Sequence, residues 1–264
     1  MGVGMKRLVR RSVIYFTIGC LLGHSTLGLA QITASSSGGQ TPFVIRAGTG
    51  VPVVNIVTAN GAGVSHNKYG DFNVGAEGAI LNNSHQIVDT QLGGKIAANP
   101  YVRYPAKVIV NEVVGAAGSR MNGPLEVAGG KAEIVVANPN GITCDGCGFL
   151  NTPRVTLTTG VPQWSADGAL AGYKITQGLI SVEGQGMNAS NLEQVDLLAR
   201  ATAVNASLWA NRLTVVGGAS DVDAQSGAVG AANGSGGAPA FWLDVGALGG
   251  MYAQRIRLVG TEAG

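Results

Sequence analysis

Two cysteines separated by two residues form the most reactive arrangement in this chain. Cys144 and Cys147 could form a disulfide, a thioredoxin-like redox centre or half of a zinc site. A redox centre needs its first cysteine at a helix N-terminus, and the glycine- and proline-containing residues 148–153 that follow cannot start a helix. Zinc needs four ligands, and the only histidines after residue 30 are His66 and His85, both distant. Of the three cysteines, Cys20 lies in the predicted signal peptide described below, and the two that remain form an even number, which in an exported chain favours a structural disulfide. We predict that disulfide here.

No catalytic constellation stands out elsewhere. His66 and His85 have no nearby serine or cysteine in the context of a nucleophile. The glycine-rich segments lack the lysine, the serine or threonine and the following helix of a phosphate-binding loop. We therefore expect no enzymatic activity, no cofactor and no metal site.

Two asparagine–proline pairs mark sharp turns that must position the cysteine pair. Asn138, Pro139, Asn140 and Gly141 suit a type I β-turn, because proline fixes φ at the second position and glycine is favoured at the fourth. Segments rich in β-branched residues flank this run on both sides, so the chain turns a corner and continues as sheet. A second pair, Asn99-Pro100, precedes the first long predicted strand.

Residues 1–30 have the anatomy of a signal peptide. A basic segment with four lysines and arginines precedes a short apolar segment at residues 13–22, and Gly28 and Ala30 supply the small residues of a cleavage site. The apolar segment is shorter than the roughly 20 residues of a membrane span. Cleavage leaves 13 basic against 15 acidic residues, a net charge of −2. No basic patch favours nucleic acid as a partner.

The composition favours a β-solenoid. The chain combines 12% charged residues with 42 glycines and 45% hydrophobic residues, which suits thin apolar layers joined by sharp turns. Strand starts recur about every 20 residues after residue 107, the length of one coil of a parallel β-helix. Roughly seven rungs would fit between residues 107 and 259 by this spacing. The predicted strands are residues 107–113, 124–127, 133–137, 154–158, 179–182, 194–198, 213–216, 241–245 and 255–259.

The remaining segments have less regular patterns. The small, polar residues 31–40 predict a flexible leader, and we expect residues 41–106 to cap the first rung, whose backbone would otherwise be bare. The low-complexity residues 217–237 predict an excursion from the solenoid. A helix remains an alternative for residues 191–212. The asparagines at the turns, among them Asn188, Asn205 and Asn211, either tolerate positive φ or form bonds from rung to rung.

The order of these motifs resembles the secretion domain of two-partner secretion exoproteins, the group of filamentous haemagglutinin and contact-dependent growth inhibition proteins. Asn138-Pro139-Asn140-Gly141 matches the second asparagine–proline motif of the family in full. The family's first motif reads Asn-Pro-Asn-Leu, of which this chain retains Asn99 and Pro100. The cysteine pair is similar to that of the growth-inhibition branch. The other matching blocks are residues 67–69, 72–74, 81–84, 90–94, 110–113, 125–129, 142–151, 154–160, 197–200, 247–252 and 258–262.

The resemblance implies an all-β, right-handed parallel β-helix with an N-terminal β cap, spanning residues 31–264. It implies the targeting of a large exoprotein to an outer-membrane β-barrel with periplasmic POTRA domains, and a place outside a Gram-negative cell reached through the periplasm. The transporter-recognition motif would comprise Asn99 and Pro100 together with Asn138, Pro139, Asn140, Gly141 and Ile142. Replacing Asn99 or Asn138 is expected to lower secretion and to leave the fold largely intact. Regions downstream of residue 264 would contact a host or neighbouring cell.

Two alternatives belong to other functional classes. A β-helical polysaccharide-active enzyme would carry a cluster of acidic or basic side chains on one face. Asp221 and Asp223 could pair, and Tyr101, Arg103 and Tyr104 could contact a sugar, although cap packing is the stronger interpretation of these three. A stand-alone adhesin would bind cells without further chain. The sequence ends within a continuing solenoid pattern, which suggests a fragment of a longer protein whose effector it does not identify.

Overall fold

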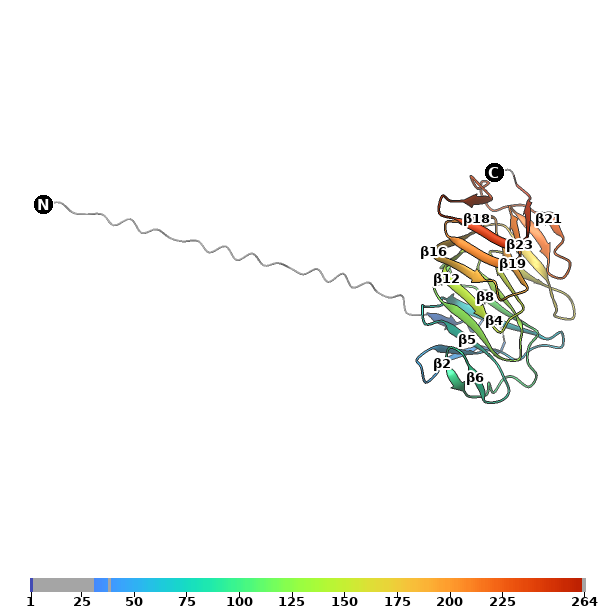
Figure 1. Cartoon of the computed structure of the whole chain (residues 1–264). Helices are drawn as coiled ribbons and strands as arrows, with labels where there is room; N and C mark the ends of the chain where they lie inside the picture. Colours follow the sequence, from blue (N-terminus) through green and yellow to red (C-terminus); the bar gives the residue numbers. More distant parts are fainter. Residues whose placement is uncertain (2–30, 38, 263–264) are drawn as a thin grey trace.

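The computed structural model describes residue 1, residues 31–37 and residues 39–262. Residues 2–30, where the signal peptide is predicted, lie outside the described residues. Figure 1 shows a stack of strands that rises from the N-terminal part to the C-terminal part. No helix among the described residues is long and apolar enough to cross a membrane. The alternative of a helix at residues 191–212 is wrong, because this segment forms strands β17 (Gln194–Leu198), β18 (Ala201–Val204) and β19 (Ser207–Gly217).

The stack is a right-handed parallel β-helix, as predicted, and its strands form three faces. The first face pairs β4 (Val64–Phe72), β8 (Val108–Val113), β11 (Glu133–Ala137), β13 (Arg154–Thr158), β17, β19 and β23 (Gly250–Gly260), all in parallel. The second face pairs β9 (Ser119–Met121), β12 (Ile142–Leu150), β16 (Leu179–Ala189), β18 and β22 (Leu243–Val245). The third face runs through β3 (Pro52–Asn55), β5 (Ala79–Asn83) and β10 (Pro124–Gly129) and continues in β12, β16, β19 and β23.

Side chains from all three faces fill the interior of the coil. One continuous cluster of buried residues runs from Val54 near the start of the stack to Val215 near its end. In-register strands place β-branched and other apolar residues above one another at spacings of about 4.8 Å, so each rung covers the rung before it. Burial of apolar surface is therefore shared between neighbouring rungs and provides the main stabilisation of the stack.

The N-terminal region both covers the first rung and contributes strands to the parallel stack. β1 (Ile32–Ala34) pairs antiparallel with β4, and β2 (Phe43–Arg46) pairs antiparallel with β3, which covers the first rung. A hairpin of β6 (Val88–Thr90) and β7 (Gly94–Ile96) adds a small sheet. Yet β3, β4 and β5 already pair in parallel with later strands. The parallel stack therefore begins before residue 107 and includes strands from the region expected to form only a cap.

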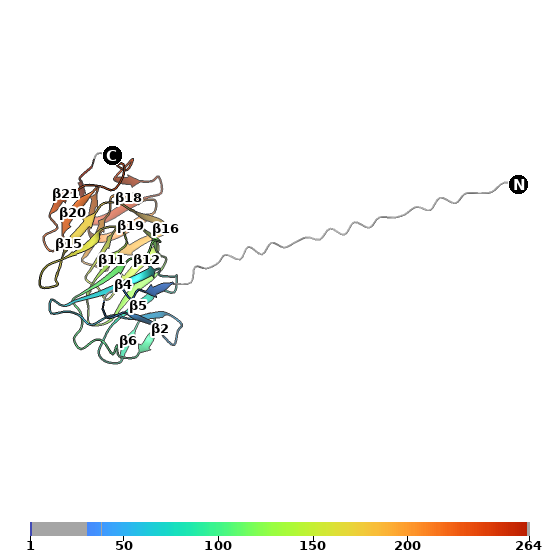
Figure 2. The ribbon, with the colours of Figure 1, turned by 180° about the vertical axis from the view of Figure 1, so that it is seen from behind.

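Two excursions leave the coil and meet. Strands β14 (Val161–Trp164) and β15 (Leu170–Ile175) come from the first, and β20 (Ser220–Asp223) and β21 (Val229–Ala231) from the second. They pair antiparallel into a four-stranded sheet beside the stack, visible from behind in Figure 2. These excursions lengthen two coils, so fewer coils fit into the same length of chain. From β8 onward, the first face has six strands among the described residues, whereas the sequence predicted roughly seven rungs.

An ion pair and its hydrogen bonds fix the second excursion to the stack. The buried Arg200 donates two hydrogen bonds to the Glu262 carboxylate, at 2.9 Å each, and further bonds to the carbonyls of Thr176 and Ser235. Glu262 also accepts the backbone N–H of Ala219. These bonds stabilise the carboxylate and lower the pKa of Glu262. Two sequence blocks 62 residues apart thus meet in one ion pair.

Candidate functional site

The corner at Asn138 joins β11 on the first face to β12 on the second. Its Oδ1 accepts the N–H of Asn140 at 2.9 Å, and the N–H of Gly141 donates to the Asn138 carbonyl at 3.0 Å, which closes the predicted turn. The Asn138 Nδ2 donates to the carbonyl of Ala117 and to the hydroxyl of Ser119, both at 3.0 Å. The side chain is fully buried and connects the turn to the previous rung.

The last two residues of this turn differ in exposure. Asn140 is exposed, and its Nδ2 donates to the carbonyl of Gly115 at 2.8 Å. Gly141 is buried with a φ of 110°, and a Cβ there would lie 2.9 Å from the Leu179 carbonyl of the next rung. Glycine is required at this position both by the backbone conformation and by the close approach of the next coil.

The corner at Asn99 has the same internal geometry. Its Oδ1 accepts the N–H of Tyr101 at 2.9 Å, and the N–H of Val102 donates to the Asn99 carbonyl at 3.2 Å. The Nδ2 of this buried asparagine donates to the carbonyls of Ile56 at 2.9 Å and Asn82 at 2.8 Å. Among the described residues, no hydrogen bond joins this corner to the one at Asn138.

Burial separates the motif residues into two groups. The side chains of Asn99 and Asn138 are inside, whereas Pro100 and Asn140 are exposed and Pro139 is partly exposed. Removing either asparagine would leave buried partners without a hydrogen bond, which costs stability. This geometry argues against the expectation that replacing them leaves the fold largely intact.

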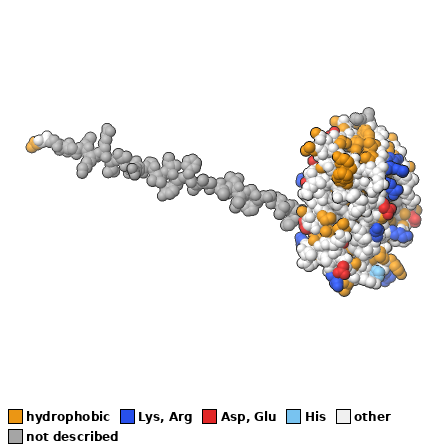
Figure 3. Space-filling view, in the orientation of Figure 1, with side chains coloured by type: hydrophobic (Ala, Val, Ile, Leu, Met, Phe, Trp, Pro, Cys, Tyr) orange, Lys and Arg blue, Asp and Glu red, His pale blue; other side chains and the backbone are white. Residues whose placement is uncertain are grey.

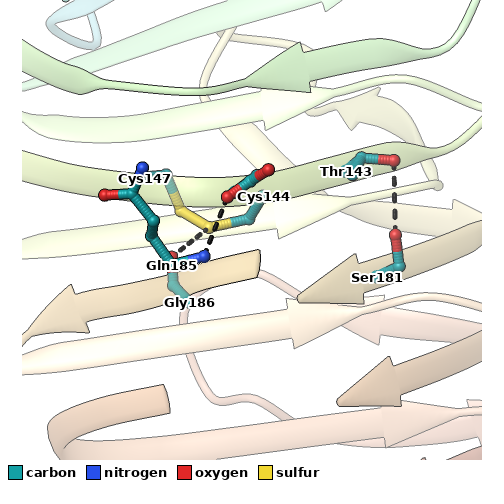
Figure 4. Close-up of a disulfide and its surroundings, with 7 residues drawn as sticks. Thr143, Cys144, Cys147, Ser181, Gln185 and Gly186 are labelled. Carbon is teal, nitrogen blue, oxygen red and sulfur yellow. Dashed lines mark hydrogen bonds between the residues drawn. A yellow bond between two sulfur atoms is a disulfide. The ribbon is translucent and has the colours of Figure 1, made fainter. Parts of the chain in front are cut away.

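The cysteines form a disulfide inside the coil. Cys144 and Cys147 lie in β12 with their Cα atoms 5.4 Å apart, and both are buried (Figure 4). The bridge spans an irregularity at which β12 bends from the second face to the third. The bridge therefore closes the bend itself, next to the Asn138 corner.

In the next rung, strand β16 has two glycines where it packs against this bend. Gly184 and Gly186 both have positive φ, and a Cβ on them would collide with the Asp145 carboxylate and the Ser207 carbonyl, respectively. The N–H of Gln185, between them, donates to Asp145 at 2.8 Å (Figure 4). Sequence reasoning missed this second bend, and the spacing of Gly184 and Gly186 was the sequence signal that could have indicated it.

Of the turn asparagines named above, Asn205 and Asn211 donate to residues of the preceding coil, whereas Asn188 accepts only from Ser190 in its own turn. Asn151 alone among the described non-glycine residues has a positive φ. Asn191 donates to the carbonyl of Phe149, and Asn211 donates to the carbonyls of Ser190 and Leu192, one coil earlier. Side-chain amides thus bind backbone carbonyls of the preceding turn, which favours the second of our two interpretations.

Sequence reasoning missed the role of Glu126. Its buried carboxylate accepts the backbone N–H groups of Gln91 at 2.8 Å and Leu92 at 2.9 Å. It therefore fixes the β6–β7 region onto the stack. Glu126 lies in the family block at residues 125–129, and its two partners lie in the block at residues 90–94. The presence of both blocks in this chain was the sequence signal that could have predicted their contact.

Other candidate residues have structural roles or lie on the surface. His66 contacts Glu112 at 2.6 Å and packs against the Trp164 ring at 4.4 Å between centroids. Asp223 accepts bonds from its own turn, chiefly from Ser226, which lowers its pKa. Tyr104 is exposed. No group of three His, Cys, Asp or Glu side chains that could hold a metal occurs within the described ranges.

Comparison with known proteins gives one consistent result. The TPS secretion domain model matches residues 30–264. The 16S rRNA endonuclease CdiA of Enterobacter cloacae is 52% identical over 239 residues, 89% of this chain and 7% of that protein. The toxin CdiA of Escherichia coli is 48% identical over 98% of this chain and 8% of that protein. The crystal structure of the filamentous hemagglutinin secretion domain matches with a TM-score of 0.81 and 34% identity, covering 88% of this chain and 80% of that one. This chain thus spans 7–8% of the length of these curated relatives.

Proposed function

This chain belongs to the family of TPS secretion domains, and we propose that it directs a large exoprotein to a dedicated outer-membrane transporter. The supporting observation is the family match over residues 30–264, on a fold shared with the filamentous hemagglutinin secretion domain. The domain is the N-terminal secretion domain of an adhesin or growth-inhibition exoprotein. Its destination is the surface or surroundings of a Gram-negative cell, by way of the periplasm and after removal of the predicted signal peptide.

The transporter recognises the chain before it folds. Asn99 and Asn138 are buried in the finished β-helix, so a partner could contact their side chains only in the unfolded chain. An extended segment rich in β-branched residues can add as a strand to the edge of a sheet, and we assign that edge to the POTRA domains of the transporter. The recognised segments are Asn99-Pro100 and the run from Asn138 to Ile142.

Folding outside the cell gives the transport its direction. Each emerging coil covers the apolar face of the one before it, and this burial disfavours return through the pore. The 12% content of charged residues suits such continuous stacking, because few charged side chains must be kept out of the core.

The toxic activities named for the relatives belong to other parts of those proteins. Several relatives are named as nucleases, but this chain aligns with only 7–8% of their length. We propose no enzymatic role for residues 31–264, and any contact with a host or neighbouring cell falls to other regions of the exoprotein.

A secretion assay with matched variants tests recognition separately from folding. Asn138→Ala removes a motif residue, whereas Leu157→Ala, at a fully buried site on β13, destabilises the same stack and leaves the motif unchanged. Both variants and the parent chain are expressed with the cognate transporter, and protein is quantified inside and outside the cells.

We expect Asn138→Ala to accumulate in the periplasm while Leu157→Ala reaches the medium. Equal secretion of the two variants would mean that the transporter responds to fold stability and not to the asparagine. Binding of the urea-unfolded chain to the periplasmic part of the transporter gives a second readout, in which stability has no influence.

A further inference from the structure

A polar groove lies where the four-stranded sheet meets the first face of the β-helix. Its volume is about 420 Å³, within the range of small-ligand sites. Strands β13, β17, β19 and β23 supply one wall, and β15 and the β20–β21 turn supply the other. The site lies away from both asparagine–proline corners, none of whose residues line it.

The negative charges at the floor of the groove are held in place by neighbours. The Arg154 Nε donates to the buried Asp196 carboxylate at 2.6 Å, and Gln194 donates to the other oxygen of Asp196 at 2.8 Å. Glu133 lies 3.8 Å from the Arg154 guanidinium. The floor of the groove thus has one hydrogen-bonded carboxylate, Asp196, and a second carboxylate, Glu133, paired with Arg154 at longer range. Both can still accept hydroxyl protons on their remaining lone pairs.

Two arginines at the rim have no such partner. Arg212 and Arg257 are exposed, and within the described residues neither has a carboxylate oxygen within 4.0 Å. Each is oriented by a backbone carbonyl instead: Arg212 donates to Glu193 and Arg257 donates to Gly227, both at 3.2 Å. Most of the N–H groups of each guanidinium therefore remain without a protein acceptor.

The register of the strands concentrates this positive charge. Arg212 on β19 lies directly beside Arg255 on β23, and Arg257 lies beside Thr214. Like charges on adjacent strands repel each other, so an anion beside these arginines would stabilise the last two rungs. Of the three arginines, Arg212 and Arg257 line the groove. Figure 3 shows basic side chains gathered along one side of the C-terminal half of the molecule.

We propose that this groove binds an acidic saccharide, with the sugar carboxylate between Arg212 and Arg257. Guanidinium groups bind carboxylates through paired hydrogen bonds. The sugar hydroxyls would bond to Asp196, Thr214 and the Glu193 carboxylate. A nucleic acid or another continuous polyanion does not fit, because four carboxylates line the same groove, so the ligand carries a single carboxylate; the four are Glu133, Glu193, Asp196 and Asp223. This function is additional to the targeting role and does not depend on it.

Titration of the purified protein with galacturonic acid and with sialyllactose, each of which carries one carboxylate, tests the proposal. The methyl ester of galacturonic acid removes only the charge, inorganic phosphate removes the sugar, and each ligand is followed by calorimetry and by amide chemical shifts. The double variant Arg212→Gln/Arg257→Gln removes the anion site, and Arg103→Gln is a control at an exposed arginine elsewhere.

We expect one or both acidic sugars to bind, with shifts confined to residues around the groove. Loss of the carboxylate or of the two arginines should weaken binding at least about tenfold, while Arg103→Gln changes it little. Absence of binding by both sugars at millimolar concentration would overturn the proposal. Equal binding of the methyl ester, of inorganic phosphate or of the double variant would overturn it as well.

Discussion

The two asparagine–proline corners have the same hydrogen-bonding geometry at different places in the stack. In each, the asparagine Oδ1 binds the N–H two residues ahead at 2.9 Å, and the Nδ2 reaches an earlier part of the chain. At Asn138 the earlier part is the loop one coil before, in the middle of the stack. At Asn99 it is the carbonyls of Ile56 and Asn82, near the covered first rungs.

The corners differ at their third and fourth positions. Asn140 binds the previous loop and Gly141 lets the next rung approach, whereas Tyr101 packs edge-on against Phe43 and Val102 is buried. Only the asparagine side-chain geometry is common to both. The shared part of the motif therefore fixes a turn, and the variable part adapts that turn to a neighbour.

Asn138→Ala should have the largest effect. It leaves the Asn140 N–H, the Ala117 carbonyl and the Ser119 hydroxyl without their partner, a loss of about 3 kcal/mol in the free energy of unfolding. Urea denaturation measures the loss. Asn140→Ala, which removes an exposed amide from the same turn, is the control and should cost less than about 1 kcal/mol. Equal losses would show that burial of Asn138 is not the source of its effect.

Asn99→Ala should cost about 2 kcal/mol and should act locally. In a stack where each rung contacts only its neighbours, a defect near one end loosens that end, whereas a defect in the middle weakens both sides. Hydrogen exchange should therefore accelerate in residues 41–106 and stay unchanged in β17 and β19. Uniform acceleration along the chain would contradict the difference between the corners.

Much of this arrangement could be predicted from the sequence, because the solenoid repeats a local rule. Strands β8, β11, β13 and β17 fall within a residue of their predicted bounds, since β-branched runs between glycine turns define them locally. The Asn138 turn was equally local. The predicted strand at 241–245 shortens to Leu243–Val245, the three residues that pair with β18, and Trp242 lies close over Gly217 and Gly260 instead.

The parts that sequence reasoning missed all depend on pairing between distant segments. Strands β14 and β15 pair with each other, but β14 is short and contains Pro162, and β15 gains its second partner only from β20 of the second excursion. The Arg200–Glu262 and Glu126–Gln91 contacts join blocks 35 or more residues apart. No periodicity within one coil encodes such contacts, and one sequence does not register separate coils.

Gly141→Ala should rank third, at about 1.5 kcal/mol, because alanine must adopt a strained positive φ and approach the Leu179 carbonyl. Thermal and urea unfolding both measure it. Gly94→Ala is the matched control: its φ is also positive, at 64°, but open space surrounds its Cβ position. If the two variants lose the same stability, backbone strain alone accounts for the requirement, and the close approach of the next rung contributes nothing.

Tyr101→Asn should have the smallest effect and gives the sharpest comparison, because it gives the first corner the family's third residue. The variant loses the Phe43 contact, whose rings lie 5.4 Å apart at 87°, and keeps both Nδ2 bonds of Asn99. We expect a change below about 1 kcal/mol in unfolding free energy and unchanged secretion. A loss as large as that of Asn99→Ala would mean that the aromatic contact holds this corner, so that the two corners would share a sequence motif but not a mechanism of stabilisation.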